Sequence, residues 1–462
     1  MHPLPDSRPR CWVTVNGVTD VVIIGAGIAG LAAAGEFLDQ GRSVVVLEAR
    51  DRVGGRILTR DHGGIGIDLG AQWLSPGNES MFYLAEQAGV QLIGPSEGSV
   101  LVRTDGVVRS LGFSDQGAAL SPFETADFGQ GVVRLRRLAE RVHTDPTWAS
   151  ANEVWLSQPL GRWIRTNLRT PGVQRNFSVL LGRLGGDPDA LSLRQALDII
   201  ASSNDLEDLY TVSGGLRLRR PIGGMGQIAE HLADRCWENI RLSTRVTGIE
   251  YDPQSATAIC DDGQRFEANR VLLAMPPWLA LNLDFNPPLP AWRTEMLAAQ
   301  TVGASIKAVL VYDTPWWREH GASGQMSADD GAVRFTFDIS DPNGPGVITG
   351  SFDDDEAVAS SALTPQEREN IFVDCLVGVL GPRATGHSGY LEHDWYADEF
   401  TAGAHSPHFA PGAWRVQGPQ LGEPLGAVRF AGAEYPDRNN GYLEGAYRSG
   451  IEQAQAIIRS LA

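Results

Sequence analysis

The stretch DVVIIGAGIAGLAAAGEFLDQGRSVVVLEAR, residues 20–50, decides the fold. Its two apolar runs, residues 21–24 and 44–47, predict parallel strands that are buried on both faces. Between them the spacing predicts a helix over residues 28–40, with Gly41 suited to end it. The stretch is therefore a βαβ unit, and it predicts an α/β fold that opens on a Rossmann-type domain.

The turn of this unit is the glycine motif Gly25-Ala26-Gly27-Ile28-Ala29-Gly30. Gly25 permits the tight turn, Gly27 lets the backbone approach a pyrophosphate, and Gly30 allows close helix packing. The helix N-terminus adds N–H donors and the positive end of its dipole. Glu48, after the second strand, can accept hydrogen bonds from a ribose and repels a 2′-phosphate, which counts against NADP. A dinucleotide site follows, with a ligand-free glycine turn as the alternative.

The next segment, RDRVGGR at residues 50–56, bears on the choice between FAD and NAD. Gly54 and Gly55 permit close backbone approach, and Arg50 and Arg56 can offset phosphate charge. This run resembles the FAD-binding signature of the flavin amine oxidase family, which includes monoamine and polyamine oxidases. A solvated basic loop is the alternative interpretation.

The resemblance continues in order along the chain, through DLGAQW (68–73), PIGGMG (221–226), LAMPP (273–277), FAGAE (430–434) and GYLEGA (441–446). It implies that Glu434 contacts the ribityl–pyrophosphate region, and that the last helix points its N-terminus at the flavin, where negative charge develops on reduction. The FAD contacts that it implies are Gly25, Gly27, Gly30, Glu48, Arg50, Gly54, Gly55, Arg56, Gly70, Ala71, Gln72, Trp73, Val246, Trp395, Gly432, Glu434, Gly441, Tyr442 and Leu443.

Three catalytic candidates also come from the resemblance. Lys307 lies where the family places a lysine that holds a water against the flavin, with a surface lysine as the alternative. Tyr442 matches one member of the aromatic pair that holds the amine, and His405 stands in place of the other. A structural role is the alternative interpretation of His405. Ala404 replaces the cysteine that carries a covalent flavin in animal monoamine oxidases, so we expect non-covalent FAD.

The chain is long enough for two domains with separate cores. We assign residues 19–95, 216–295 and 400–462 to a discontinuous FAD-binding domain, and residues 96–215 and 296–399 to an inserted α+β substrate-binding domain. Residues 1–18 form a leader without a signal-like apolar run. Candidates for the substrate pocket, with ordinary core packing as the alternative, are Ile199, Phe335, Phe337 and Phe352.

Charge and cysteine content exclude several classes of protein. The 38 Lys and Arg against 56 Asp and Glu give a net charge of −18, which disfavours binding to nucleic acid or to an anionic membrane. No stretch reaches the about 18 uninterrupted apolar residues of a transmembrane helix. The four cysteines are far apart, which indicates neither a metal site nor a disulfide framework. We therefore expect a cytoplasmic protein without metal; the oligomeric state is not fixed, and a homodimer is the commonest assembly.

The resemblance implies an FAD-dependent oxidase that takes a hydride from the carbon beside an amine nitrogen, passes the electrons to dioxygen and forms an imine and hydrogen peroxide. An L-amino acid oxidase is one alternative, although Gln72-Trp73 stands where such relatives place a carboxylate-binding arginine. Arg60, Arg103, Arg183 or Arg334 could replace it. A polyamine oxidase and a non-catalytic flavin-bound module also stay open.

Overall fold

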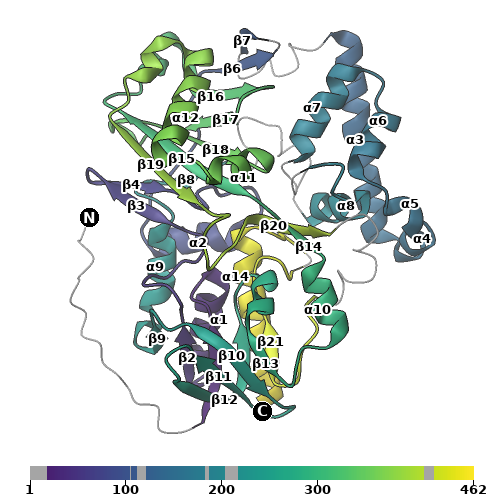
Figure 1. The fold of residues 1–462 in the computed structure, drawn as a ribbon, viewed down its shortest axis with the longest axis vertical. Coiled ribbons are helices and arrows are strands. Elements are labelled where there is room, and N and C mark those ends of the chain that lie inside the picture. The colour runs from purple at the N-terminus through teal and green to yellow at the C-terminus, as the bar shows by residue number, and fades with distance from the viewer. Residues whose placement is uncertain are drawn as a thin grey trace.

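The structure is a computed structural model that describes residues 18–104, 106–111, 121–182, 187–202, 217–409, 421–436 and 438–461. All but the last residue of the expected leader lies outside this set. Two large sheets organise the described chain, and a group of helices lies beside them (Figure 1).

The first sheet gathers strands from three distant parts of the chain. Its order is β13-β10-β11-β12-β1-β2-β9, and β21 also pairs with β12. β1 runs parallel to β2 and β12, as the βαβ interpretation requires. The strands are β1 (Thr19–Ile24), β2 (Val44–Leu47), β9 (Ile240–Arg241), β10 (Val246–Tyr251), β11 (Ala256–Cys260), β12 (Arg265–Leu273), β13 (Asp284–Asn286) and β21 (Val428–Phe430).

The register brings three chain segments together at one edge of this sheet. Ile24 of β1 lies opposite Leu273 of β12, and Leu273 lies opposite Phe430 of β21. Because β1, β12 and β21 are parallel, the residues that follow each of them emerge at the same edge. The glycine turn, the segment after residue 273 and the segment after residue 430 therefore meet there.

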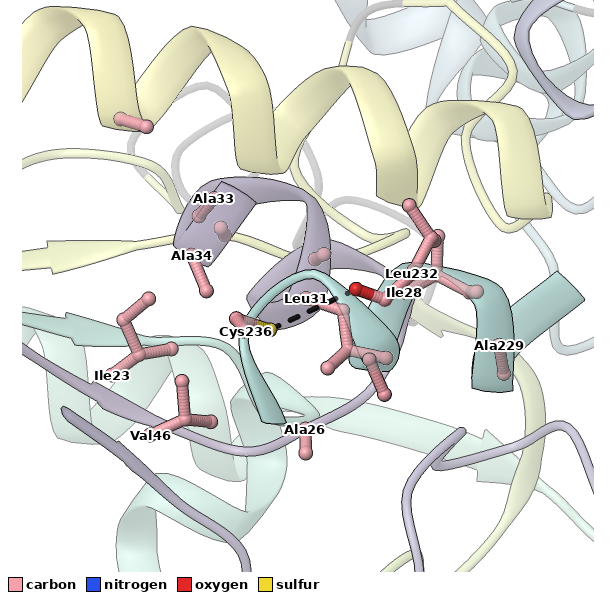
Figure 2. Close-up of a cluster of buried hydrophobic side chains, with 14 of the residues drawn as sticks. Ile23, Ala26, Ile28, Leu31, Ala33, Ala34, Val46, Ala229, Leu232 and Cys236 are labelled. Carbon is pink, nitrogen blue, oxygen red and sulfur yellow. Dashed lines mark hydrogen bonds between the residues drawn. The ribbon is translucent and has the colours of Figure 1, made fainter. Parts of the chain in front are cut away.

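Helices cover both faces of the first sheet. Figure 2 shows one of these cores, where Ile23 and Val46 of the sheet lie with Leu31 of α1 and Leu232 of α9. α1 and α14 pack closely, since a Cβ added at Gly450 would lie 2.2 Å from the Ala29 carbonyl oxygen. The helices are α1 (Ile28–Asp39), α2 (Glu79–Gln87), α9 (Gly226–Asp234) and α14 (Leu443–Leu461) on this face, and α10 (Ala291–Ala298) by the other.

The second sheet has the order β19-β15-β18-β17-β16-β6-β7, and α11 (Asp355–Ser361) and α12 (Pro365–Leu380) pack near it. Five of its strands lie within residues 305–394. The strands are β6 (Ser99–Thr104), β7 (Val107–Leu111), β15 (Ser305–Tyr312), β16 (Ala322–Ala328), β17 (Val333–Asp338), β18 (Gly346–Asp353) and β19 (Gly389–Asp394).

A helical group with its own core lies between β7 and the return to the first sheet. It stands apart from both sheets in Figure 1. Its members are α3 (Pro122–Thr144), α4 (Pro146–Ala151), α5 (Glu153–Leu156), α6 (Leu160–Asn167), α7 (Pro171–Gly182) and α8 (Leu193–Ser202). Separate cores for this group and for each sheet explain how a chain of this length buries its apolar residues.

Short two-stranded ribbons connect these parts. They are β3 (Thr59–His62) with β4 (Ile65–Asp68), β5 (Leu92–Ile93) with β8 (Arg220–Pro221), and β14 (Gln300–Gly303) with β20 (Ala404–Phe409). The last ribbon joins segments that the sequence assigned to different domains. The α/β fold class is confirmed, and the exact domain boundaries stay a prediction.

Of the helices in the described part of the chain, none combines the length and apolar character needed to cross a bilayer. The same residues contain no cluster of three or more histidine, cysteine or acidic side chains arranged for a metal ion.

Candidate active site

A cavity of about 1080 Å³ is lined by residues of both large sheets and of the helical group. Its nucleotide end is the glycine turn after β1. Gly25 has a φ of +105°, and a Cβ there would lie 2.5 Å from the Ala274 carbonyl oxygen. Glycine is therefore required by both backbone conformation and close approach. A Cβ on Gly30 would lie 2.0 Å from the Gly25 oxygen, so Gly30 packs the turn and does not itself line the cavity.

The second glycine motif packs against the first. Gly54 donates its N–H to the Ala26 carbonyl at 2.9 Å, and a Cβ on Gly55 would lie 3.3 Å from Gly27 Cα. Gly27, Gly54 and Gly55 all line the cavity. Their missing side chains leave room for a ligand to contact the backbone at the N-terminus of α1, which is the site an anionic pyrophosphate needs.

Glu48 is a buried carboxylate at the same end. Its Oε2 accepts the Ala26 N–H at 2.7 Å and its Oε1 accepts the Arg50 N–H at 2.9 Å. These bonds hold the carboxylate at the cavity wall, where each oxygen keeps a further lone pair for a ribose hydroxyl.

Two arginines predicted to contact phosphates are held by acidic partners. Arg56 donates to Glu434 Oε1 at 2.6 Å, and Arg50 donates to Asp398 and, at 2.8 Å, to Thr401. Burial acts to raise the pKa of Asp398, but the hydrogen bond from His393 and the Arg50 charge outweigh it and lower that pKa to about 2. Asp398 is therefore a permanent anion that orients Arg50.

Glu434 lies behind Arg56 and does not line the cavity. Its carboxylate orients that arginine, while Oε2 is buried without a hydrogen-bond partner among the described residues. An orphaned buried acceptor is costly. The cofactor is fitted instead by the residues that do line the cavity, because the backbone of Gly27, Gly54 and Gly55 leaves room for a pyrophosphate and the Glu48 carboxylate can accept from a ribose.

The flavin end is expected where α14 begins. Gly441, Tyr442 and Leu443 line the cavity at the N-terminus of this helix. Glu444 does not reach the cavity, because its carboxylate accepts the Ser80 and Met81 N–H groups at the start of α2. The helix end thus stays free to place its positive dipole toward a ligand.

Lys307 enters the cavity from β15. Its Nζ donates to the Gly70 carbonyl at 2.8 Å and to Gln72 Oε1 at 2.6 Å. The side chain is part-buried in the cavity wall, and burial lowers the pKa of Lys307 to about 7, although the nearby Asp68 charge acts to raise it. A lysine with this pKa changes charge near neutral pH, which is typical of functional sites.

The far end of the cavity carries aromatic side chains. Trp73 meets Phe337 edge to face, with ring centroids 6.3 Å apart, and Arg217 lies over the Phe337 ring at 4.0 Å. Ile199 and Phe335 also line this cavity.

Phe352 is a correction to the predicted pocket. It is fully buried in the core of the second sheet and does not line the cavity. Along β18 successive side chains point to opposite faces. Ser351, which pairs with Lys307, faces the cavity, whereas Phe352, which pairs with Ile306, faces the core.

The remaining predicted residues either line the cavity or, in the case of His405, have a side chain outside the described set. Those that line the cavity as expected, besides residues already described, are Gly70, Ala71, Gln72, Val246, Trp395 and Gly432. Trp395 is fixed by donating its indole N–H to the Leu69 carbonyl at 2.7 Å. His405 lies in β20, and its side chain is outside the described set.

Some cavity residues were not predicted. Arg217 and Thr349 line the wall although no motif surrounds them, so the sequence held no local signal for them. Asp398, which orients Arg50 but does not itself line the cavity, had no local signal either, because Arg50 is 348 positions away. Asp68, which lines a separate small cavity and not this one, did have a signal, since it opens the quoted segment DLGAQW.

These features define a class: a nucleotide-binding α/β fold whose cavity runs from a pyrophosphate cradle to an aromatic wall across a buried lysine. Comparison with known proteins makes the assignment specific. The model of the family described as flavin containing amine oxidoreductase matches residues 28–458, so the chain belongs to this family.

Similar proteins agree with this. AofH, a candidate flavin-containing monoamine oxidase of Mycobacterium tuberculosis H37Rv, is 32% identical over 447 residues, covering 96% of this chain and 97% of that one. The structure of putrescine oxidase bound to putrescine has a TM-score of 0.90 and 28% identity, covering 96% and 99%. Cyclohexylamine oxidase from Brevibacterium oxydans IH-35A has a TM-score of 0.88 and 30% identity, covering 96% and 100%. The chain is an FAD-dependent amine oxidase, which confirms the expected cofactor and reaction class.

Proposed function

We propose that the amine is oxidised in the part of the cavity between Lys307, Tyr442 and the wall formed by Ile199, Phe335 and Phe337. One observation carries this proposal: a continuous cavity joins the two glycine motifs to this aromatic wall, and Lys307 lies on its surface. FAD, when bound, accepts a hydride from the carbon beside the amine nitrogen and passes the electrons to dioxygen, which gives an imine and hydrogen peroxide.

The residues of the chain orient the amine and control its charge. A hydride leaves only when the nitrogen lone pair is available, so the amine must bind neutral. An apolar, water-poor wall favours the neutral form because burial disfavours the ammonium ion. Tyr442 supplies one aromatic face for the substrate, and His405 is proposed for the other side.

Lys307 contributes a positive charge where dioxygen takes up electrons. A preorganised cation stabilises negative charge as it develops in a water-poor site. Gly70 and Gln72 fix the direction of the ammonium group, so little reorganisation is needed.

We propose that FAD is held without a covalent bond. Ala404 lines the cavity where covalent members of the family have a cysteine, and a methyl group offers no nucleophile. Denaturation in acid should therefore release all of the yellow cofactor into the supernatant. Colour that stays with the precipitated chain would overturn this part of the proposal.

The function is tested by a peroxide-release assay on purified, FAD-saturated protein. The panel contains aryl, alkyl and cyclic amines, with putrescine and spermidine to test the polyamine alternative. We expect turnover of apolar monoamines, and loss of the visible flavin absorption when such an amine is added without oxygen. An unchanged flavin spectrum with every amine would contradict the proposal.

An amino acid substrate is the second candidate, because Arg217 and Arg334 line the same cavity. A guanidinium there can bind a substrate carboxylate. Comparison of phenethylamine with L-phenylalanine decides between the two, since they differ only in the carboxylate. We expect the amine to have the higher kcat/KM; the reverse order would identify an amino acid oxidase.

Two further assignments are proposals from the sequence. The scattered cysteines support a cytoplasmic location; the three in the described residues are free thiols. A homodimer is proposed as the commonest assembly. Fractionation of cells and light scattering of the purified protein test these two assignments.

A further inference from the structure

Residues 398–401, here called the clasp, lie at the nucleotide end of the cavity, and the last three of them line it. Glu48, the carboxylate suited to a ribose, lines the same end. The Thr244 N–H donates to the Glu48 carbonyl at 2.8 Å, so the start of β10 lies beside Glu48, and residues 244–247 line the cavity as well. The clasp and these two segments of the first sheet therefore bound the nucleotide end together.

A buried set of contacts fixes the clasp to the segment that follows β2. Arg50, two residues after Glu48, donates to Asp398 and, at 2.8 Å, to the Thr401 hydroxyl. The Arg50 and Asp398 side chains are 12% and 11% exposed. The Trp278 indole N–H donates to the Thr401 carbonyl at 2.8 Å. These contacts anchor both ends of the clasp, and solvent screens them little.

A second ion pair joins the clasp to the start of β10 at the surface. Arg245 Nη1 lies 2.6 Å from Glu399 Oε1, and the two side chains are 46% and 60% exposed. Both residues also line the cavity, so the pair stands at its rim. An ion pair this exposed contributes little to the stability of the fold. It can therefore open while the buried contacts stay in place.

The Phe400 ring lies between the two ion pairs. Its centroid is 5.3 Å from the guanidinium carbon of Arg50 and 5.6 Å from that of Arg245. Both distances are within the roughly 6 Å over which an aromatic ring attracts a cation. The ring therefore connects the exposed pair to the buried one.

We propose that the clasp closes the nucleotide end of the FAD site and that the Arg245–Glu399 pair holds it closed. The pair retains FAD by slowing its release, and it takes no part in amine oxidation. Retention of this kind is needed where no covalent bond holds the cofactor. The inference therefore rests on the proposed non-covalent binding of FAD.

A general effect of charge would act in the opposite direction to the clasp in one variant, Glu399→Lys. FAD carries negative charge on its pyrophosphate, so an added positive charge at the rim attracts FAD and slows its release. The same variant sets two cations against each other at the rim and pushes the clasp open. The sign of the change in release rate therefore separates the two explanations.

The test measures FAD release from the full-length, FAD-loaded protein, by flavin fluorescence after dilution into buffer without flavin. Glu399→Lys breaks the rim pair, and the double variant Arg245→Glu/Glu399→Lys restores it with the charges exchanged. Glu250→Lys is the matched control. Glu250 pairs with Arg265 at 2.5 Å, their side chains are 42% and 47% exposed, and neither residue lines the cavity. The control thus makes the same change of net charge in a pair of similar exposure.

We expect Glu399→Lys to release FAD at least about fivefold faster than the wild type, because an attraction is replaced by a repulsion. The double variant should return the rate to within about twofold of the wild type, since the two changes are coupled. Glu250→Lys should not release FAD faster than the wild type. Slower or unchanged release from Glu399→Lys, fast release that the double variant does not correct, or equally fast release from Glu250→Lys would overturn the proposal.

Hydrogen exchange of the same proteins keeps this inference separate from the proposed non-covalent binding. The backbone N–H groups of residues 400–402 donate to Asp398, so their exchange reports opening of the clasp. Faster exchange there in Glu399→Lys, corrected in the double variant, supports the clasp even if the flavin is covalently bound. Flavin that stays on the acid-denatured chain rejects non-covalent binding alone, whereas exchange equal to that of the wild type rejects the clasp.

Discussion

At the nucleotide end of the cavity the wall is mostly backbone, and at the substrate end it is mostly side chain. Gly25, Gly27 and Gly55 come within 55 residues of the N-terminus and pack through missing Cβ atoms. Ile199, Arg217 and Phe337 come from a helix, a loop and a strand of other parts of the chain. In the first kind of wall an added side chain either collides with backbone or fills the space of the ligand. In the second kind residues can change, and with them the substrate, without loss of the fold.

The largest expected effect is a difference in stability between alanine substitutions at two glycines of the same motif, Gly30 and Gly27. In Gly30→Ala the new Cβ would lie 2.0 Å from the Gly25 oxygen, so the turn must move. We expect a loss of about 5 kcal/mol or more in unfolding free energy, or no folded protein. The measurement is chemical unfolding followed by circular dichroism.

Gly27→Ala is the control for that variant. Its Cβ would meet no atom closer than 4.0 Å, and its φ of −75° suits alanine. We expect a folded protein with at least about tenfold weaker FAD binding, because the methyl group faces the cradle. Equal stability of the two variants would show that the motif is a ligand cradle alone.

A smaller effect is expected when a phenylalanine of the core, Phe352, is compared with a phenylalanine of the cavity wall, Phe335. Phe352 is fully buried, so Phe352→Ala should cost about 3–5 kcal/mol of stability. Phe335 is partly exposed at the cavity, so Phe335→Ala should cost less than about half of that and mainly change KM across the amine panel. Unfolding curves and steady-state kinetics measure the two effects. A selective change of substrate preference in Phe352→Ala would place that residue in the site after all.

Lys307→Met tests the residue between the two ends. We expect about 10²-fold slower reoxidation of the bound flavin by dioxygen, because a preorganised charge is lost. Stopped-flow mixing with oxygen measures this step apart from amine oxidation. Reoxidation at the wild-type rate would remove Lys307 from the oxygen reaction.

The smallest effect is a dependence of stability on pH. The pKa of Lys307 is about 7 in the folded chain against an ordinary 10.5, so between these values the unfolded chain binds more protons. Stability relative to Lys307→Met should therefore rise with pH in this window, by at most about 1 kcal/mol between pH 7 and 8. The unfolding free energies of the wild type and of Lys307→Met, measured at several pH values and a fixed excess of FAD, give this relative stability. A fall over the same interval would mean that burial does not disfavour the charged lysine.

The nucleotide end could be predicted from the sequence because its contacts are local or follow from motif order. The strand, turn and helix of residues 20–50 carry their own periodicity, and the structure ends α1 one residue before the prediction. Gly30 was assigned both packing and cofactor contact, and only the packing is seen. Strand alternation along β18 could have excluded Phe352, but only once the face that Lys307 occupies was known.

By itself, the sequence determined the class of fold, since glycine spacing and strand periodicity act over short distances. The cofactor and the family were implied by the resemblance of its ordered motifs to those of the flavin amine oxidases. Only the tertiary structure decided that Asp398 orients Arg50, that Glu434 lies behind Arg56, and that Arg217 stands over Phe337. These pairs are separated by 120 to 378 positions. Their energies depend on distance and burial in space, which no local pattern of residues encodes.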